Sequence, residues 1–305
     1  MPSRLTGLHR RILPAVLAAL VPLATLAAPA PVTFTRGPLT RSVQNESDAA
    51  IDRACAWLAA RQNPAGYWGE SDAGLTAVCA LALAGSGEEL PPAERATVDR
   101  AVAWLASPSA TNALPSTLAA TNATAAAALA WRDMALAVFS PATPPDTNFL
   151  SSTAAPDAAG FALREAVVLR LVGAAPAAAG NLFPVGTGDF CADAQRALVA
   201  GDSASASLAA LRGEALVAAR KVLADLRRGL PGGGSASCWR FARCVNRSLG
   251  GEVSLTAGEE VVSLPWRSRL ANFWTTSQRI DDQGRGHWKD SVEETAFAVL
   301  LLKEL

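Results

Sequence analysis

The sequence predicts an all-α fold built from repeated pairs of helices, on three observations. Half of the 305 residues are hydrophobic, and Ala-rich stretches, which favour helices, dominate the chain. The segment 51–59 recurs at 98–106 with an offset of 47 residues, and self-similarity on this scale is typical of repeat architectures. Within each copy the apolar residues follow the spacing of one helix face, as Ile51, Ala54 and Leu58 do in the first.

Each unit is predicted to contain an outer helix, a turn and an inner helix. After the first copy, the stretch 61–69 contains Pro and Gly, which end the helix and form a turn. The next stretch, 73–83, is apolar on nearly every side, as expected for a helix that is buried all round. Arg53 and its repeat counterpart Arg100 are left on the outer face of the outer helices.

The C-terminal part of the chain repeats this order. A helix ends near Gln278, a turn follows at 281–288, and an apolar helix occupies 294–302. In both turns a Gln precedes a Gly-x-Trp sequence, and the residues are Gln62, Gly66, Trp68, Gln278, Gly286 and Trp288. These turns resemble the Gln…Gly-x-Trp motif of the prenyltransferase and squalene–hopene cyclase repeat family. The resemblance implies that the motif lies between an outer and an inner helix and ties successive units together.

Together with the chain length, the repeat predicts an α/α toroid, a barrel of up to six helix pairs of the terpenoid-cyclase type. We expect this domain to span 49–305, after an extended linker at 31–48. Three units are directly visible in the sequence. In the middle of the chain, helices are expected at 117–139, 161–172 and 203–228, and loops at 140–158 and 173–190.

Residues 1–30 have the pattern of a secretory signal peptide. Three Arg residues precede the apolar stretch 12–28, and small residues follow it. The stretch is at the short limit for a membrane span, and two prolines interrupt it. We therefore expect cleavage and export to the periplasm or the extracellular space, with no stable membrane span afterwards.

The charge pattern disfavours nucleic-acid binding. Basic and acidic residues number 27 each, and loss of the signal peptide removes three Arg and no acid. A nucleic-acid-binding protein would instead carry a basic patch. Arg240, Arg243 and Arg247 follow helical spacing and are interpreted as the solvated stripe of one helix.

The five Cys residues leave two interpretations open. Export permits disulfides, and Cys55 and Cys79 lie on adjacent predicted helices that could bring them together. An odd number of Cys leaves at least one unpaired. The alternative, held equally, is that all five are small buried hydrophobic residues.

The candidate catalytic residues gather near the second turn. The cyclases of the family protonate an alkene with an Asp-x-Asp-Asp motif, which this chain lacks. Asp281 and Asp282 form the only Asp pair and are interpreted as a solvated turn. His287 is the only His after the signal peptide, and Glu293 and Glu294 begin the last inner helix, where acids favour the helix dipole. Whether the protein is an enzyme stays open.

We expect no cofactor, and a metal site is kept as a weaker alternative. Protein prenyltransferase subunits bind zinc through Asp, Cys and His, with the Asp and Cys one residue apart. Asp189, Cys191 and His287 match this pattern. Three such residues coincide often by chance, so the prediction is that no metal or other cofactor is bound.

Three functions are compatible with this architecture. The first is a non-catalytic binding or scaffold protein with an apolar cavity for a lipid, an isoprenoid or a protein segment. The second is an enzyme acting on a polyprenoid or a polysaccharide, and the third is an interaction domain. Trp residues without a counterpart in the repeat could line a cavity, and these are Trp131, Trp239, Trp266 and Trp274.

Overall fold

The computed structural model confirms the all-α prediction. It describes residues 37–84, 92–112, 123–139, 189–200, 205–227, 234–257 and 260–305. These residues are mostly helical, and they also form two small antiparallel sheets of two strands each. The predicted signal peptide, the helix expected at 161–172 and the loop expected at 140–158 lie outside the described residues. The elements are α1 (Arg41–Ala59), α2 (Ala73–Leu83), α3 (Pro92–Ala106), α4 (Pro108–Asn112), α5 (Ala123–Phe139), α8 (Phe190–Ala200), α9 (Ser205–Arg227), α10 (Gly234–Leu249), β1 (Ser254–Ala257), β2 (Glu260–Ser263), α11 (Trp266–Thr276), β3 (Arg279–Ile280), β4 (Gly286–His287) and α12 (Val292–Glu304).

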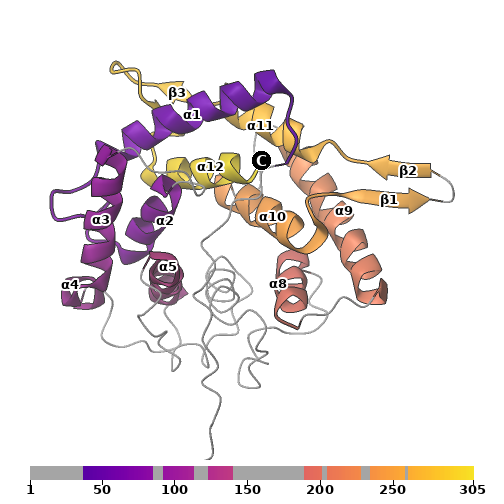
Figure 1. Ribbon diagram of the computed structural model, residues 1–305, viewed down its shortest axis with the longest axis horizontal. Helices are drawn as coiled ribbons and strands as arrows, with labels where there is room; N and C mark the ends of the chain where they lie inside the picture. The colour runs from indigo at the N-terminus through magenta and orange to yellow at the C-terminus, as the bar shows by residue number, and fades with distance from the viewer. Residues whose placement is uncertain are drawn as a thin grey trace, which may run out of the picture.

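The helices form an outer and an inner layer. In Figure 1, α3, α1, α11 and α9 arch over α5, α2, α12, α10 and α8. Within the inner layer, α2 packs between α5 and α12, and α10 packs between α12 and α8. The C-terminal pair of helices therefore lies beside the N-terminal pair, although the two are at opposite ends of the sequence.

The inner helices are buried because they are apolar on all sides. Every residue of α2 except Leu75 is buried, and so is every residue of α12 from Thr295 onward. Small residues allow close packing: a Cβ added to Gly74 would lie 2.9 Å from the Cα of Ala128 in α5. No described helix is both long and apolar enough to cross a membrane.

Three aromatic rings from three helices of the inner layer meet. Trp131 of α5, Trp239 of α10 and Phe297 of α12 are all buried. The ring centroids lie 5.6 Å apart for Trp131 and Trp239, 5.4 Å for Trp131 and Phe297, and 5.8 Å for Trp239 and Phe297. At these separations the rings attract one another beyond their burial. We call these three residues the aromatic cluster.

The expected linker at 31–48 is wrong over its second half, because α1 begins at Arg41. Side-chain contacts one helical turn apart occur in this stretch. Ser47 is buried and its hydroxyl donates to the Val43 carbonyl at 2.8 Å, while the Gln44 amide donates to the Asp48 carboxylate at 3.1 Å. The sequence offers no strong apolar stripe before Ala50, so the helix was not evident from periodicity alone.

The predicted arginine stripe is also wrong for Arg243, which is 2% exposed. Its guanidinium donates to the Glu304 carboxylate at 2.7 Å, and the Asn246 amide donates to the other Glu304 oxygen at 2.9 Å. A buried charge needs such a partner because the interior solvates it poorly. Helical spacing therefore placed Arg243 on a face that packs against α12, and its partner comes from 61 residues away.

The five Cys residues are all free thiols, and the Cys55–Cys79 pair is not linked. Four of them are buried. Burial raises the pKa of the Cys55 thiol to about 11 and that of Cys238 to about 12, because the thiolate loses its solvation. The interpretation as small buried hydrophobic residues is therefore confirmed for four of the five, and it is wrong for Cys191, which is only partly buried at the start of α8.

Candidate functional site

The first motif turn connects α1 to α2 and also holds the next outer helix, α3. The Gln62 amide donates to the Gly66 carbonyl at 3.0 Å and to the Thr97 carbonyl of α3 at 2.9 Å. The Gln62 oxygen accepts two bonds from the Arg100 guanidinium, at 3.0 and 2.7 Å. Gly66 has φ +101°, and a Cβ there would lie 2.4 Å from the Arg100 carbonyl oxygen. Only Gly allows this close approach.

The motif Trp fixes the two helices of its own unit. The Trp68 indole N–H donates to the Leu58 carbonyl at the end of α1, at 2.8 Å. Its backbone N–H donates to the Thr76 hydroxyl of α2 at 3.1 Å. The Asp72 carboxylate caps α2 by accepting from two backbone N–H groups of the first turn. The ring is fully buried, so the outer and inner helices are joined around it.

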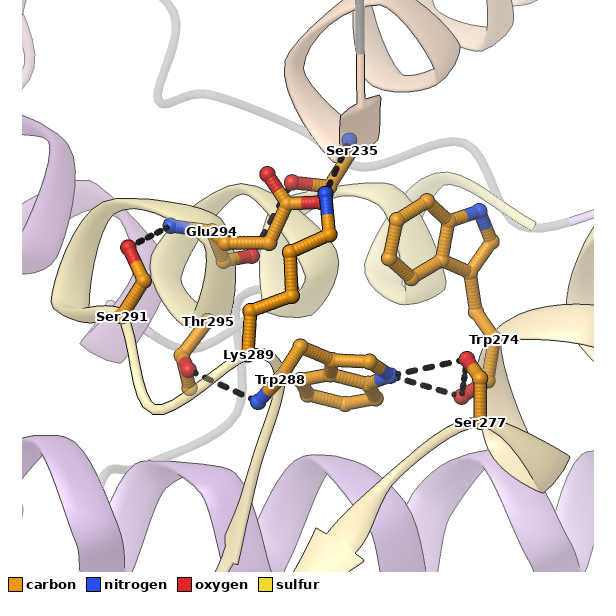
Figure 2. Close-up of polar contacts among 8 residues, drawn as sticks. All are labelled: Ser235, Trp274, Ser277, Trp288, Lys289, Ser291, Glu294 and Thr295. Carbon is orange, nitrogen blue, oxygen red and sulfur yellow. Dashed lines mark hydrogen bonds and ion pairs between the residues drawn. The ribbon is translucent and has the colours of Figure 1, made fainter. Parts of the chain in front are cut away.

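The second motif turn repeats these contacts between α11 and α12, as Figure 2 shows. The Trp288 indole N–H donates to the Trp274 carbonyl at 2.9 Å, and its backbone N–H donates to the Thr295 hydroxyl at 3.1 Å. Ser291 caps α12 by accepting from the Glu294 backbone N–H. Trp288 and Thr295 therefore have the roles of Trp68 and Thr76.

The Gln of the second turn binds α1. The Gln278 amide donates to the Ala50 carbonyl at 2.8 Å, and the Arg53 guanidinium donates to the Gln278 oxygen at 2.9 Å. Ala50 and Arg53 are the residues 47 positions before Thr97 and Arg100. Both turns thus bind an outer helix at the same repeat positions. We call this contact, Gln to carbonyl and Arg to Gln, the Gln–Arg latch.

Asp281 and Asp282 belong to the turn itself. The Asp281 carboxylate accepts from the Arg285 side chain and backbone, each at 2.9 Å, and from the Gln283 backbone at 2.9 Å. Burial alone would raise the pKa of Asp281, but these hydrogen bonds and the Arg285 charge outweigh it and lower the pKa below its ordinary value. Asp282 is exposed. An ionised, hydrogen-bonded Asp is a turn residue and a poor proton donor.

His287 is also engaged in the packing of the turn. Its ring stacks on Trp57 of α1 with centroids 5.2 Å apart. Its Nδ1 accepts from the Asp290 backbone N–H at 3.1 Å. The Arg61 guanidinium lies 3.5 Å from the Trp57 ring centroid and pairs with Asp290 at 3.3 Å. These contacts place His287 between the second turn and α1.

The two Glu residues of α12 differ in their surroundings. The Glu294 carboxylate accepts from Lys289 at 2.9 Å and from the backbone of Ser235, at the start of α10, at 3.4 Å (Figure 2). Burial, followed by the charges of Glu294 and Asp72, raises the pKa of Glu293. Carboxylates from the starts of α2 and α12 are thus close enough to interact.

The predicted zinc set is not assembled. The Asp189 carboxylate accepts from the Cys191 backbone N–H at 3.1 Å, as a cap at the start of α8. α8 packs on α9 and α10, whereas His287, in β4, packs on α1. The described residues contain no group of three His, Cys, Asp or Glu side chains that could hold a metal ion. The spacing of Asp189 and Cys191 is explained by helix capping.

A pocket of about 580 Å³ lies between α8, α9 and α10, and no pattern in the sequence predicted it. Glu214 and Lys221 of α9 line it, together with Phe241 of α10. One signal in the sequence was available: Gly213 interrupts an otherwise strong helix. The walls come from three helices, so their convergence could not be inferred from spacing along the chain.

Comparisons of the chain with protein-family models, with curated proteins and with solved structures found no match. The functional argument therefore depends on the geometry of the two motif turns, the aromatic cluster and the pocket. Of the sequence-predicted residues, the structure brings each Gln, Gly and Trp set together within its own turn.

Proposed function

We propose that the chain is a non-catalytic binding or scaffold protein built on an α/α toroid of the terpenoid-cyclase type. The observation that carries the proposal is the second Gln–Arg latch, in which Gln278 binds Arg53 at a sequence separation of 225 residues. In a ring of repeats, the last unit precedes the first and must bind it as any unit binds the next. A latch between the C-terminal turn and α1 is the contact that such a ring requires.

The absence of catalysis is supported by the structural roles of the candidate residues. Asp281 is held by Arg285, His287 by Trp57 and Asp290, and Glu294 by Lys289. A general acid needs a raised pKa and a route to the substrate. Of the candidate residues, Glu293 alone combines a raised pKa with the absence of a side-chain hydrogen bond among the described residues, and neighbouring carboxylates account for part of that pKa shift.

The ligand class we propose is apolar: a lipid, an isoprenoid or an apolar protein segment. The inner helices present aromatic rings to one another at the aromatic cluster, with Trp131 and Phe297 both buried. Apolar and aromatic walls bind apolar ligands mainly by removing surface from water. We expect the binding space to adjoin this cluster.

The test is native mass spectrometry and solvent extraction of the full chain purified without detergent, followed by incubation with farnesol as a probe. We expect retained lipid or saturable farnesol binding, weakened about tenfold in Trp131→Ala because a buried aromatic contact is lost. Ile280→Ala is the matched control, since Ile280 is 52% exposed at the second turn. Chemical conversion of a polyprenoid would show that the protein is an enzyme. Absence of any bound apolar ligand would reject the proposed apolar ligand class.

Export is a separate part of the proposal and depends on residues 1–30. Their composition predicts a cleaved signal peptide. Fractionation of cells that produce the full chain, with mass determination of the product, tests this directly. A product that begins near residue 29 outside the cytoplasm is expected. An intact N-terminus in the cytoplasm would contradict it.

A further inference from the structure

The pocket between α8, α9 and α10 has the size of a small-ligand site. Its volume of about 580 Å³ falls within the range of pockets that bind small organic molecules. It is distinct from the motif turns and contains none of the aromatic cluster. The residues used below are Phe190, Gly213, Glu214, Val217, Lys221 and Phe241.

The polar part of the pocket has an excess of acid. Its lining includes three carboxylates, of Asp189, Glu214 and Asp225, and one ammonium group, of Lys221. Among the described residues, one Glu214 oxygen is buried without a hydrogen-bond partner. Buried polar atoms usually have a partner, and an exception asks for an explanation.

A buried carboxylate of α8, which is not itself part of the pocket lining, interacts electrostatically with Glu214. Asp193 of α8 is 5% exposed, and neither of its oxygens has a hydrogen-bond partner among the described residues. Its ion pair with Arg196 is long, at 3.7 Å. Burial and then the Asp193 charge raise the pKa of Glu214, the Arg196 charge offsets part of this rise, and the Asp189 charge adds a smaller one. This end of the pocket would gain from a positive charge.

Apart from Ser237, the remaining walls are apolar. Phe190 and Phe241 are buried, with ring centroids 6.1 Å apart. Val217 of α9 also lines the pocket and is 68% exposed, one of two large hydrophobic residues with such exposure in the described chain. An apolar side chain that faces an open pocket is a natural contact for an apolar ligand.

Gly213 keeps the pocket open. Gly is the least favourable residue inside a helix after Pro, because it leaves the backbone unconstrained when unfolded. At many helix positions Gly is needed because a neighbour lies too close for a Cβ. Here an added Cβ would meet no atom within 4 Å among the described residues. Packing therefore does not require Gly213, whereas an unobstructed pocket does.

We propose that this pocket binds a small organic cation, an amine with an apolar body. The ammonium group would lie at Glu214, and the apolar body would lie against Phe190, Phe241 and Val217. Charge complementarity selects the amine, because the same body with a carboxylate would meet like charge. This site goes beyond the apolar ligand proposed above and does not depend on it.

The experiment is isothermal titration of the full chain with n-octylamine, n-octanol and n-octanoate, which share one body and differ in charge. We expect octylamine to bind at least about tenfold more tightly than octanol, since a charge-assisted hydrogen bond is added, and octanoate to bind least. Equal affinity for octylamine and octanol would overturn the proposal.

Two variants locate the site. Glu214→Gln keeps the shape of the side chain and is expected to weaken octylamine binding about tenfold, as loss of a charged partner does. Gly213→Leu is expected to abolish binding while raising the unfolding temperature, because Leu favours the helix and fills open space. Raised stability separates this loss from misfolding.

The matched control is Asp282→Asn, which removes an exposed carboxylate at the distant second turn. It should bind octylamine as the unaltered chain does. Unchanged affinity in either Glu214→Gln or Gly213→Leu would place the amine elsewhere and reject the site. Farnesol binding should be unchanged in both pocket variants, so the two proposals fail separately.

Discussion

The two motif turns make the same contacts across very different sequence separations. The first latch joins Gln62 to Arg100, 38 residues apart, and the second joins Gln278 to Arg53, 225 residues apart. The distances agree closely, with Gln-to-carbonyl bonds of 2.9 and 2.8 Å. The geometry of the motif is therefore a property of the turn and its outer helix. It does not depend on which part of the chain supplies that helix.

The turns differ in length mainly before the Trp, since the Trp and Thr that follow are 8 residues apart in the first turn and 7 in the second. The second has four more residues between its Gln and its Trp, and these residues accompany the β3–β4 hairpin. Asn63 and Asp281 occupy matching places: each backbone N–H donates to a carbonyl four residues on, and each side chain accepts from the backbone two residues on. Additional residues are tolerated at the tip because the latch and the Trp contacts lie at its base.

The largest effect is expected from the motif Trp residues. Trp68→Ala and Trp288→Ala should each lower the free energy of unfolding by about 3–5 kcal/mol, because each leaves a large buried cavity and an unpaired carbonyl. Urea denaturation measures the change. If one variant lost less than half of the free energy of unfolding that the other loses, the two turns would not be energetically equivalent.

Substitution of the two motif Gly residues should destabilise the first turn more than the second. In Gly66→Ala the new Cβ meets the Arg100 backbone at positive φ, and we expect a loss of about 2–4 kcal/mol. In Gly286→Ala the three atoms nearest to the new Cβ all belong to the Gln278 side chain, which can move, and we expect a loss of about 1–2 kcal/mol. Thermal unfolding of both variants gives the comparison. If Gly286→Ala lost more stability than Gly66→Ala, the Gln278 side chain would be the more rigid of the two obstacles, which contradicts this interpretation.

The Thr residues that bind the Trp backbone should be equivalent. Thr76 and Thr295 are fully buried, and each accepts from a Trp N–H at 3.1 Å. Thr76→Val and Thr295→Val keep the volume and leave a buried N–H unpaired, so each should cost about 1–3 kcal/mol. Thr276→Val, at an exposed position of α11, is the control. Denaturant unfolding measures the loss. If both Thr→Val variants were as stable as the unaltered chain, the role assigned to Thr76 and Thr295 would be wrong.

The Gln residues test the latch at each separation. Gln62→Ala and Gln278→Ala each remove bonds to a carbonyl and an Arg while leaving the helices intact, so the expected loss is about 1 kcal/mol. Hydrogen exchange should localise the effect: faster exchange in α3 for Gln62→Ala and in α1 for Gln278→Ala. If Gln278→Ala left α1 unaffected, the C-terminal unit would not hold the N-terminal helix.

The smallest effect is a pH dependence confined to the second turn. The lowered pKa of Asp281 means that its contribution to stability is complete above the ordinary carboxyl value of 3.8 and is lost as pH falls through the lower folded value. Asn63 does not titrate, so the first turn should not respond. NMR of the Arg285 and Tyr67 amides during acid titration compares them. A matching response in both turns would exclude Asp281 as the cause.

The sequence by itself determined the repeat, the bounds of α2 and the motif residues. These features are local: the 47-residue offset, the apolar run at 73–83 and the Gln…Gly-x-Trp spacing are all visible within one segment. It also predicted the long helix α9 to within two residues at each end. Local periodicity suffices wherever burial follows directly from the pattern of apolar residues.

The tertiary structure alone decided which distant segments meet. Arg53 looked like a solvated residue of an outer helix, and Arg243 like part of a solvated stripe, yet each binds a partner from the C-terminal unit. The same holds for the pocket around Glu214, which requires three helices to converge. Periodicity assigns a residue to a face of its helix, but the neighbour of that face is set by packing between helices, which no local pattern encodes.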